Sequence, residues 1–341
     1  MVEPHRLENL IRLGSWFSDP HSEWSKALHR RLPEAEQKNG WFTADQILFS
    51  VDAWARALSS EKLPHSPLLR SAQTCTTPRT VGLISAGNIP LVGLHDLLCL
   101  YLSGHNVLWK PATEDAVLPH LLLETFSNLD PGFSISLSNG KWTGLDALIA
   151  TGSNNSSRYF EAYFGHLPRI IRKSRTSIAL LTGDEQESDL LKLGEDVFRY
   201  FGLGCRNVTQ LWIPHGFPLD RFFGAIAPFG NIINHRKYAN NYDYQRAVFL
   251  LNRVPFLDNN FLLVRENDDA FSPVGVLHVW RYTDREEALQ RASTLSESIQ
   301  CWVGNPSSWA LPVLPFGEAQ KPSFDDFADG VNTLQFLSEL C

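Results

Sequence analysis

A cysteine that follows two closely spaced glycines is the residue best suited to chemistry in this chain of 341 residues. Cys205 stands in the segment Phe201-Gly-Leu-Gly-Cys-Arg-Asn-Val208, before a β-rich apolar run that ends at Pro214. Flanking glycines leave room for a planar electrophile to reach the thiol, and the backbone N–H of Cys205 can face that electrophile. This pattern is typical of a nucleophile in acyl or carbonyl chemistry, although a lone cysteine is more often a buried core residue.

The elements around a second polar segment predict a parallel sheet. An apolar strand from Val81 runs into Ser85-Ala86-Gly87-Asn88-Ile89-Pro90, and a helical pattern follows. A second strand ends at Trp109-Lys110-Pro111, and a third ends at Thr151-Gly152-Ser153, again before a helical pattern. Strands and helices that alternate along the chain in this order are typical of an α/β fold with a parallel sheet.

The chain is long enough for two domains. We predict a helical N-terminus with a cofactor-binding domain over residues 1–170, and a catalytic α/β domain over residues 171–341. Within the second domain the patterns predict strands at 177–181, 208–214 and 248–251, and a helix before Cys205.

Composition excludes several classes of function. Hydrophobic residues make up 43% and charged residues 20%, which is ordinary for a globular protein. The net charge is −7 and no basic stripe is present, so we expect no nucleic-acid partner. No apolar run is long enough for a membrane span, and the N-terminus lacks the layout of a signal peptide.

The five cysteines are scattered and never spaced as Cys-x-x-Cys. This spacing argues against a zinc site and against a disulfide framework. We therefore expect no metal, and we expect a reducing, cytoplasmic compartment.

Six motifs in a fixed order resemble the aldehyde dehydrogenase superfamily. They are Asn88-Ile-Pro, Trp109-Lys110-Pro111, Thr151-Gly152-Ser153, Gly204-Cys205, Phe271-Ser-Pro-Val274 and Pro315-Phe-Gly317. The segments Phe201–Val208, Lys237–Tyr244 and Phe316–Pro322 resemble, more narrowly, the acyl-CoA reductases related to the long-chain fatty acyl reductase of bacterial bioluminescence. The likeness spans residues 79–336 and implies a Rossmann-like cofactor domain joined to a catalytic domain.

The resemblance implies catalytic roles for two residues. Cys205 matches the nucleophile of the superfamily, whose thiolate is the reactive form. Asn88 matches the side-chain donor to the oxyanion, and a neutral amide stabilises that charge without protonating it. An Asx turn before Pro90 is the alternative interpretation of Asn88.

The resemblance also implies a cofactor site without the Gly-x-Gly-x-x-Gly fingerprint. Lys110 matches the lysine that meets the adenosine ribose or its 2′-phosphate, although an exposed lysine at a strand end is common. Ser85 and Ala86 would lie beside the adenosine. Gly152 and Ser153 stand where a helix begins, and the free N–H groups there favour a pyrophosphate.

Asp269 and Phe271 complete the implied cofactor contacts. Asp269 lies where the superfamily has a glutamate that holds the nicotinamide ribose, and it is one methylene shorter. A solvated loop carboxylate is the alternative interpretation. Phe271 would pack near the nicotinamide.

One departure from the superfamily indicates the reaction. The stretch over residues 172–180 matches the strand where hydrolytic relatives carry Glu-Leu-Gly-Gly, and it contains no carboxylate. Without a base to activate water, an acyl-enzyme would persist and exchange with a thiol such as coenzyme A. This favours an acyl-CoA reductase that uses NADPH, with NADH as the second choice, an acyl thioester as substrate, and a homo-oligomer as a compatible assembly.

Two alternatives stay open. One is another enzyme on the same scaffold that oxidises aldehydes or reduces acyl phosphates. The other is a non-catalytic binding protein that retains the fold.

Overall fold

The computed structural model describes residues 2–138, 140 and 142–341, which form two compact units. The first unit comprises Met1–Ser174 together with Pro322–Cys341, and the second comprises Arg175–Lys321. The boundary lies close to the predicted one, but the last twenty or so residues return to the first unit rather than staying with the second. No helix in residues 2–138, 140 and 142–341 is both long and apolar enough to cross a membrane.

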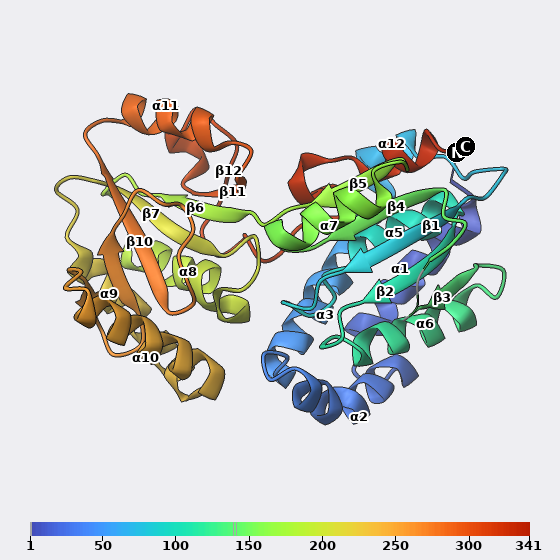
Figure 1. The fold of residues 1–341 in the computed structure, drawn as a ribbon, viewed down its shortest axis with the longest axis horizontal. Coiled ribbons are helices and arrows are strands. Elements are labelled where there is room, and N and C mark those ends of the chain that lie inside the picture. Colours follow the sequence, from blue (N-terminus) through green and yellow to red (C-terminus); the bar gives the residue numbers. More distant parts are fainter. Residues whose placement is uncertain (1, 139, 141) are drawn as a thin grey trace. The chain divides into compact units, whose positions relative to one another are not determined.

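The first unit is built on a sheet whose strands all run parallel (Figure 1). Its described elements are α1 (Pro4–Ser18), α2 (Glu23–Lys38), α3 (Ala44–Ala57), η1 (Leu63–His65), α4 (Pro67–Ser71), β1 (Thr80–Ser85), α5 (Leu94–Ser103), β2 (Asn106–Pro111), α6 (Val117–Leu129), β3 (Ile135–Leu137), β4 (Ala147–Thr151), α7 (Asn154–Phe164), β5 (Arg169–Arg172), η5 (Ala328–Gly330) and α12 (Thr333–Ser338). The strand order among the described residues is β3-β2-β1-β4-β5. Strand β4 is an uninterrupted buried apolar run, as expected for an inner strand of a parallel sheet.

The second unit is built on a larger sheet. Its described elements are β6 (Thr176–Leu180), α8 (Glu187–Phe198), η2 (Arg199–Gly202), β7 (Val208–Pro214), α9 (Leu219–Ile226), η3 (Ala227–Asn234), α10 (Arg236–Leu251), β8 (Leu257–Asp258), β9 (Leu263–Glu266), β10 (Val276–Tyr282), α11 (Arg285–Leu295), β11 (Ile299–Gly304), η4 (Pro306–Ser308) and β12 (Val313–Leu314). The strand order is β12-β11-β6-β7-β10-β9-β8, and only β8 runs antiparallel to its described neighbour. Successive residues of β6 belong to different apolar clusters, since Ala179 belongs to one cluster and Ile178 and Leu180 belong to the other. Both faces of this sheet are therefore covered.

A buried ion pair explains why the C-terminal segment returns to the first unit. The Arg172 guanidinium lies 2.7 Å from an Asp96 oxygen, and both side chains are almost fully buried. Arg172 also donates to the carbonyl of Ala328 at 2.7 Å and to the hydroxyl of Thr333 at 2.8 Å. Helix α12, red in Figure 1, packs on α5 as a result.

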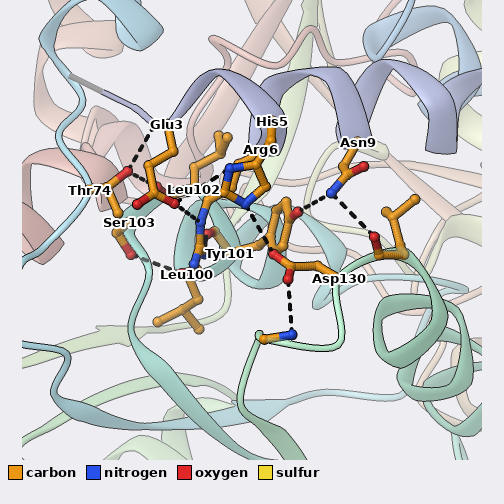
Figure 2. Close-up of polar contacts among 12 residues, drawn as sticks. Glu3, His5, Arg6, Asn9, Thr74, Leu100, Tyr101, Leu102, Ser103 and Asp130 are labelled. Carbon is orange, nitrogen blue, oxygen red and sulfur yellow. Dashed lines mark hydrogen bonds and ion pairs between the residues drawn. The ribbon is translucent and has the colours of Figure 1, made fainter.

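Helix α1 is held to the first unit by a polar network (Figure 2). Arg6 donates to the backbone carbonyl of Tyr101 and pairs with Glu3 at 3.0 Å. Asn9 donates to the Tyr101 hydroxyl at 2.8 Å, and burial raises the pKa of that hydroxyl to about 12. These contacts fix the first helix against the end of α5.

The structure corrects the expectation that no disulfide forms. Cys75 and Cys341 are bonded, with their Cα atoms 5.4 Å apart and a sequence separation of 266. The spacing rule missed this pair because the return of the C-terminal segment brings the two residues together. The cysteine pattern therefore no longer supports a reducing compartment.

His105 lies beside this pair, and the three side chains are close enough to share a metal ion. The imidazole is fully buried and bonded at both ends. Its Nδ1 accepts from the Arg79 N–H at 3.1 Å, and its Nε2 donates to the Leu337 carbonyl at 3.0 Å. A neutral imidazole used in this way has no lone pair left for a metal, so a disulfide is the better assignment.

We expect the disulfide to be visible by mass. The denatured, non-reduced chain should be lighter by two hydrogens than the reduced chain, and Cys75→Ser should remove that difference. Reduction should also lower stability by about 2–4 kcal/mol, because a long loop is released in the unfolded state. Cys99→Ser is the control and should keep the mass difference. Equal masses before and after reduction would contradict the pairing.

Candidate active site

The turn that carries Cys205 joins η2 to β7 and contains an unusual backbone. Tyr200, Phe201 and Gly202 adopt left-handed conformations in succession, with φ values of 53°, 57° and 78°. Such conformations cost about 1–3 kcal/mol each at non-glycine residues and are common at functional sites. The chain therefore reverses tightly just before the cysteine, whose side chain is half-buried.

Asn207 holds both ends of this turn. Its Oδ1 accepts the N–H of Gly204 at 2.7 Å, next to the cysteine. Its Nδ2 donates to the carbonyls of Arg199 at 2.8 Å, Asp196 at 3.1 Å and Val197 at 3.3 Å. These carbonyls lie at the end of α8, where helical carbonyl groups lack intrahelical partners.

Ser177 on β6 contacts the cysteine from the other side. Its Oγ donates to the Cys205 carbonyl at 3.1 Å and lies 3.1 Å from the Cys301 sulfur. Burial raises the pKa of Cys301 to about 11, so this second thiol stays protonated at neutral pH. A protonated Cys301 can donate to Ser177, which leaves the hydroxyl proton of Ser177 for the Cys205 carbonyl.

Asp196 links the cysteine turn to the loop after β12. Its carboxylate accepts the N–H groups of Gly317 at 2.6 Å and Ala319 at 3.0 Å. Burial raises the pKa of Asp196 to about 7, and the two N–H groups oppose that shift. Arg206 donates to the Ala319 carbonyl at 3.4 Å, so this loop is fixed from both sides.

The loop with Asp269 and Phe271 folds back over the first half of β7. Thr209, four residues after Cys205, donates to the Ala270 carbonyl at 2.6 Å. Asp269 is exposed, and its Oδ1 accepts the N–H of Phe271 at 2.9 Å. One carboxylate oxygen of Asp269 therefore shapes the turn, and the Phe271 ring is 38% exposed.

In the first unit, the predicted cofactor residues gather at one edge of the sheet. Ile84 pairs with Lys110 on one side and with Ala150 on the other, and Ser85 pairs with Pro111. The carboxyl ends of β1, β2 and β4 are thus neighbours. Ligands of open α/β sheets bind at this edge.

Ser85 has a structural role at this edge. Its Oγ accepts the indole N–H of Trp109 at 2.9 Å, and its carbonyl accepts the N–H of Ala112 at 3.0 Å. Ser85 is buried, Ala86 is half-buried and Lys110 is exposed at the end of β2. Of these three, only Lys110 presents a charged side chain to solvent.

Two helices anchor the Asn88 loop by its backbone. Asn39, at the end of α2, donates to the Gly87 carbonyl at 2.9 Å. Ser50 on α3 donates to the Pro90 carbonyl at 3.1 Å. The sequence alone did not point to Asn39 or Ser50, because no local pattern relates them to a loop about 40 residues away.

The start of α7 suits an anion. Ser153 is the N-cap, and its Oγ accepts the N–H of Ser156 at 3.2 Å. Gly152 packs closely there, since a Cβ would lie 2.9 Å from the Ser156 Cβ. Helix α7 therefore starts directly after β4, next to the strand β1 that also pairs with the Lys110 strand, and the first N–H groups of a helix favour an anion.

A buried carboxyl lies in the loop that follows Lys110. Asp115 is 4% exposed, and its Oδ1 has no hydrogen-bond partner. Burial raises the pKa of Asp115 to about 7. The folded state thus binds this proton more tightly than the unfolded state.

We expect a corresponding pH dependence of stability. Between about pH 4 and pH 7 the unfolded chain loses the Asp115 proton first, so stability falls as pH rises. Asp115→Asn should flatten this slope and raise stability at pH 8 by on the order of a few kcal/mol. Thermal melts across this range measure the effect, and Glu8→Gln, an exposed carboxyl of α1, is the control. An unchanged slope in Asp115→Asn would contradict the assignment.

The structure thus places the predicted residues in two groups. The first unit holds Ser85, Ala86, Asn88, Lys110, Gly152 and Ser153, and the second unit holds Cys205, Asp269 and Phe271. The supporting residues that the sequence did not reveal are Asn39, Ser50, Ser177, Asp196, Thr209 and Asn207.

Comparisons with known proteins give similarities in structure only. No protein-family model matches the chain, and no curated protein matches its sequence. An oxidoreductase from Marinobacter aquaeolei is 13% identical with a TM-score of 0.63, over 94% of this chain and 82% of that chain. The aldehyde dehydrogenase KauB from Pseudomonas aeruginosa is 12% identical with a TM-score of 0.61, over 91% of this chain and 73% of that one.

A third structure extends the comparison to a cofactor complex. The Δ-pyrroline-5-carboxylate dehydrogenase from Mycobacterium tuberculosis, bound with NAD, is 14% identical with a TM-score of 0.60. The match covers 89% of this chain and 66% of that enzyme, so this chain spans slightly less than two thirds of its length. These likenesses confirm the predicted fold class, an α/β fold similar to that of the aldehyde dehydrogenases.

Proposed function

We propose that this protein is an oxidoreductase of the aldehyde dehydrogenase type that reduces an acyl thioester to an aldehyde. The observation that carries the proposal is the Cys205 turn, which Asn207 and Ser177 hold on both sides of the cysteine. A half-buried thiol on a fixed, glycine-lined turn is what covalent acyl transfer requires. The fold that the comparisons indicate is one on which such chemistry occurs.

The residues at the edge of the first sheet fit a nicotinamide dinucleotide. The start of α7 would hold the pyrophosphate, and Lys110, at the end of β2, would meet the adenosine ribose or its 2′-phosphate. Two similar structures are described with NAD, which supports a nicotinamide cofactor. We prefer NADPH because of the reductive direction and Lys110, with NADH as the alternative.

The protein's own residues account for acyl transfer. The Cys205 thiolate attacks the thioester carbonyl, a sulfur–carbon bond forms, and coenzyme A leaves as its thiolate. The Cys205 N–H would donate to the oxyanion, and the resemblance to the superfamily assigns the side-chain donor to Asn88. A nicotinamide cofactor, when bound, would supply the hydride for reduction of the acyl group to an aldehyde. Departure of the aldehyde returns the Cys205 thiolate.

The surroundings of β6 support reduction over hydrolysis. The strand that enters the second unit carries Ser177 near the cysteine and has no carboxylate over residues 172–180. Glu185 follows the opposite end of β6, where it accepts the N–H of Thr182 at 2.5 Å and that of Gly183 at 2.9 Å. The Glu185 carboxylate is therefore hydrogen-bonded within its own loop, at the end of β6 opposite to Ser177 and the cysteine.

A substrate panel tests the function. Acyl-CoAs of several chain lengths are mixed with NADPH or NADH, and nicotinamide absorbance is followed. Acyl phosphates, and aldehydes with the oxidised cofactors, form the other arms. Oxidation of reduced cofactor that requires an acyl-CoA is the expected result. Turnover only with aldehydes or acyl phosphates would indicate an enzyme of the same class with a different substrate. Failure of Cys205 to react with any donor would indicate a binding protein.

Lys110→Ala is expected to weaken cofactor binding by about 1–3 kcal/mol, because a charge-assisted hydrogen bond is lost. Acylation of Cys205 should stay near the wild-type rate. Titration of cofactor fluorescence measures the dissociation constant, and Lys62→Ala, an exposed lysine of the same unit, is the control. An unchanged dissociation constant would show that Lys110 does not contribute to cofactor binding.

A further inference from the structure

We propose that Asn207 is a positioning residue for the Cys205 nucleophile, a role that rests on the proposed function. Asn207 follows Cys205 by two residues and is fully buried. Its side chain makes four hydrogen bonds, all to backbone groups. A side chain that touches only backbone acts on the path of the chain rather than on a substrate.

The four bonds close the left-handed turn at both ends. On one side Nδ2 binds the carbonyl of Arg199, the residue immediately before the left-handed segment. On the other side Oδ1 binds the N–H of Gly204, immediately before Cys205. A segment with consecutive left-handed residues persists only where surrounding contacts determine it. Asn207 supplies such contacts on both sides of the left-handed segment, at Arg199 and at Gly204.

An asparagine is specifically suited to this task. Gly204 offers a donor and the end of α8 offers acceptors, so the side chain must accept at one atom and donate at another. Aspartate keeps the acceptor but loses both donors, and alanine loses all of them. The geometry therefore selects the amide.

The hydrogen bonds of Asn207 also connect the cysteine turn to a second loop, at residues 317–319. The Asp196 carbonyl accepts from Asn207, while the Asp196 carboxylate accepts the N–H groups of Gly317 and Ala319. Arg206, between Cys205 and Asn207, donates to the Ala319 carbonyl. Loss of the Asn207 amide would thus release the cysteine turn from α8 and break its link through Asp196 to the 317–319 loop, while the Arg206 contact with that loop would remain.

The test compares Asn207→Ala with Asn259→Ala. Asn259 is the matched control because it closes a turn of its own, between β8 and β9 of the same unit, by accepting the N–H groups of Phe261 and Leu262. Both variants should lose stability. Only Asn207→Ala should lower the rate of Cys205 acylation, by about 10- to 100-fold, since small displacements of a reacting group are costly. Its affinity for NADPH should not change.

Alkylation separates this inference from the proposed function. Iodoacetamide labelling of Cys205, quantified by peptide mapping across pH, needs no acyl donor. The midpoint of this pH profile should move in Asn207→Ala and stay in place in Asn259→Ala, because the cysteine loses its surrounding dipoles only in the first. Lack of acylation in the wild-type protein would reject the function, while the alkylation profile would still decide the role of Asn207.

A measurement on the wild-type protein covers the case in which Asn207→Ala does not fold. The Gly204 amide should be strongly protected from hydrogen exchange, because it donates to a buried oxygen. Rapid exchange at Gly204, or an alkylation profile and acylation rate in Asn207→Ala equal to those in Asn259→Ala, would overturn the proposal.

Discussion

Cys205→Ala is expected to abolish formation of the acyl-enzyme. Alanine keeps the hydrogen bonds that the side chains of Asn207 and Ser177 make to the backbone of Gly204 and of residue 205. The variant therefore removes the sulfur without removing the site. Loss of a nucleophile typically lowers turnover by several orders of magnitude, so we expect a decrease of roughly 10⁴ or more.

Intact mass after incubation with acyl-CoA, without nicotinamide, measures this directly. The wild-type protein should gain one acyl group that persists, because residues 172–180 provide no carboxylate to activate water. Cys301→Ser is the matched control: it removes the neighbouring thiol, keeps a hydrogen-bonding group beside Ser177, and should still gain the acyl group. An acyl adduct on Cys205→Ala would reject Cys205 as the nucleophile.

Much of the fold could be predicted because strands and helices left clear periodic patterns. The strands β1, β4, β6 and β7 are largely buried apolar runs, and they lie close to the predicted positions. The predicted strand at 248–251 is instead the last turn of α10. Leu250 and Leu251 are 60% and 83% exposed, so these apolar residues are not core residues and their pattern was misleading. His235 caps the start of this helix by accepting the N–H of Tyr238, and this polar contact gave no apolar signal.

The candidate site was predictable only in part. Cys205, Asn88 and Lys110 stand in motifs that chain order makes recognisable, so a sequence can identify them. Asn39, which holds the Asn88 loop, and Ser177, which contacts the Cys205 carbonyl, lie at least 28 residues from their partners. The Cys75–Cys341 bond spans 266 residues. Such contacts depend on how the sheets and the C-terminal return assemble, and local patterns do not encode them.

Asn88→Ala is expected to reduce the rate of Cys205 acylation by about 10²–10³, the typical effect of removing one donor to an oxyanion. The structure makes this variant informative. Asn39 and Ser50 hold the carbonyls of Gly87 and Pro90, so the loop backbone has anchors other than the Asn88 side chain. Loss of the amide should therefore leave the loop and the affinity for cofactor in place.

Asn88→Asp sharpens the test because it keeps the size of the side chain but places negative charge where the oxyanion must form. It should be at least as slow as Asn88→Ala. Rapid-mixing measurement of coenzyme A release in the first turnover isolates acylation from hydride transfer. Asn39→Ala is the matched control for loop displacement, since it frees the Gly87 carbonyl but retains the Asn88 amide. A wild-type rate of release in Asn88→Ala would mean that Asn88 only forms the turn before Pro90, and that the oxyanion is stabilised by other donors.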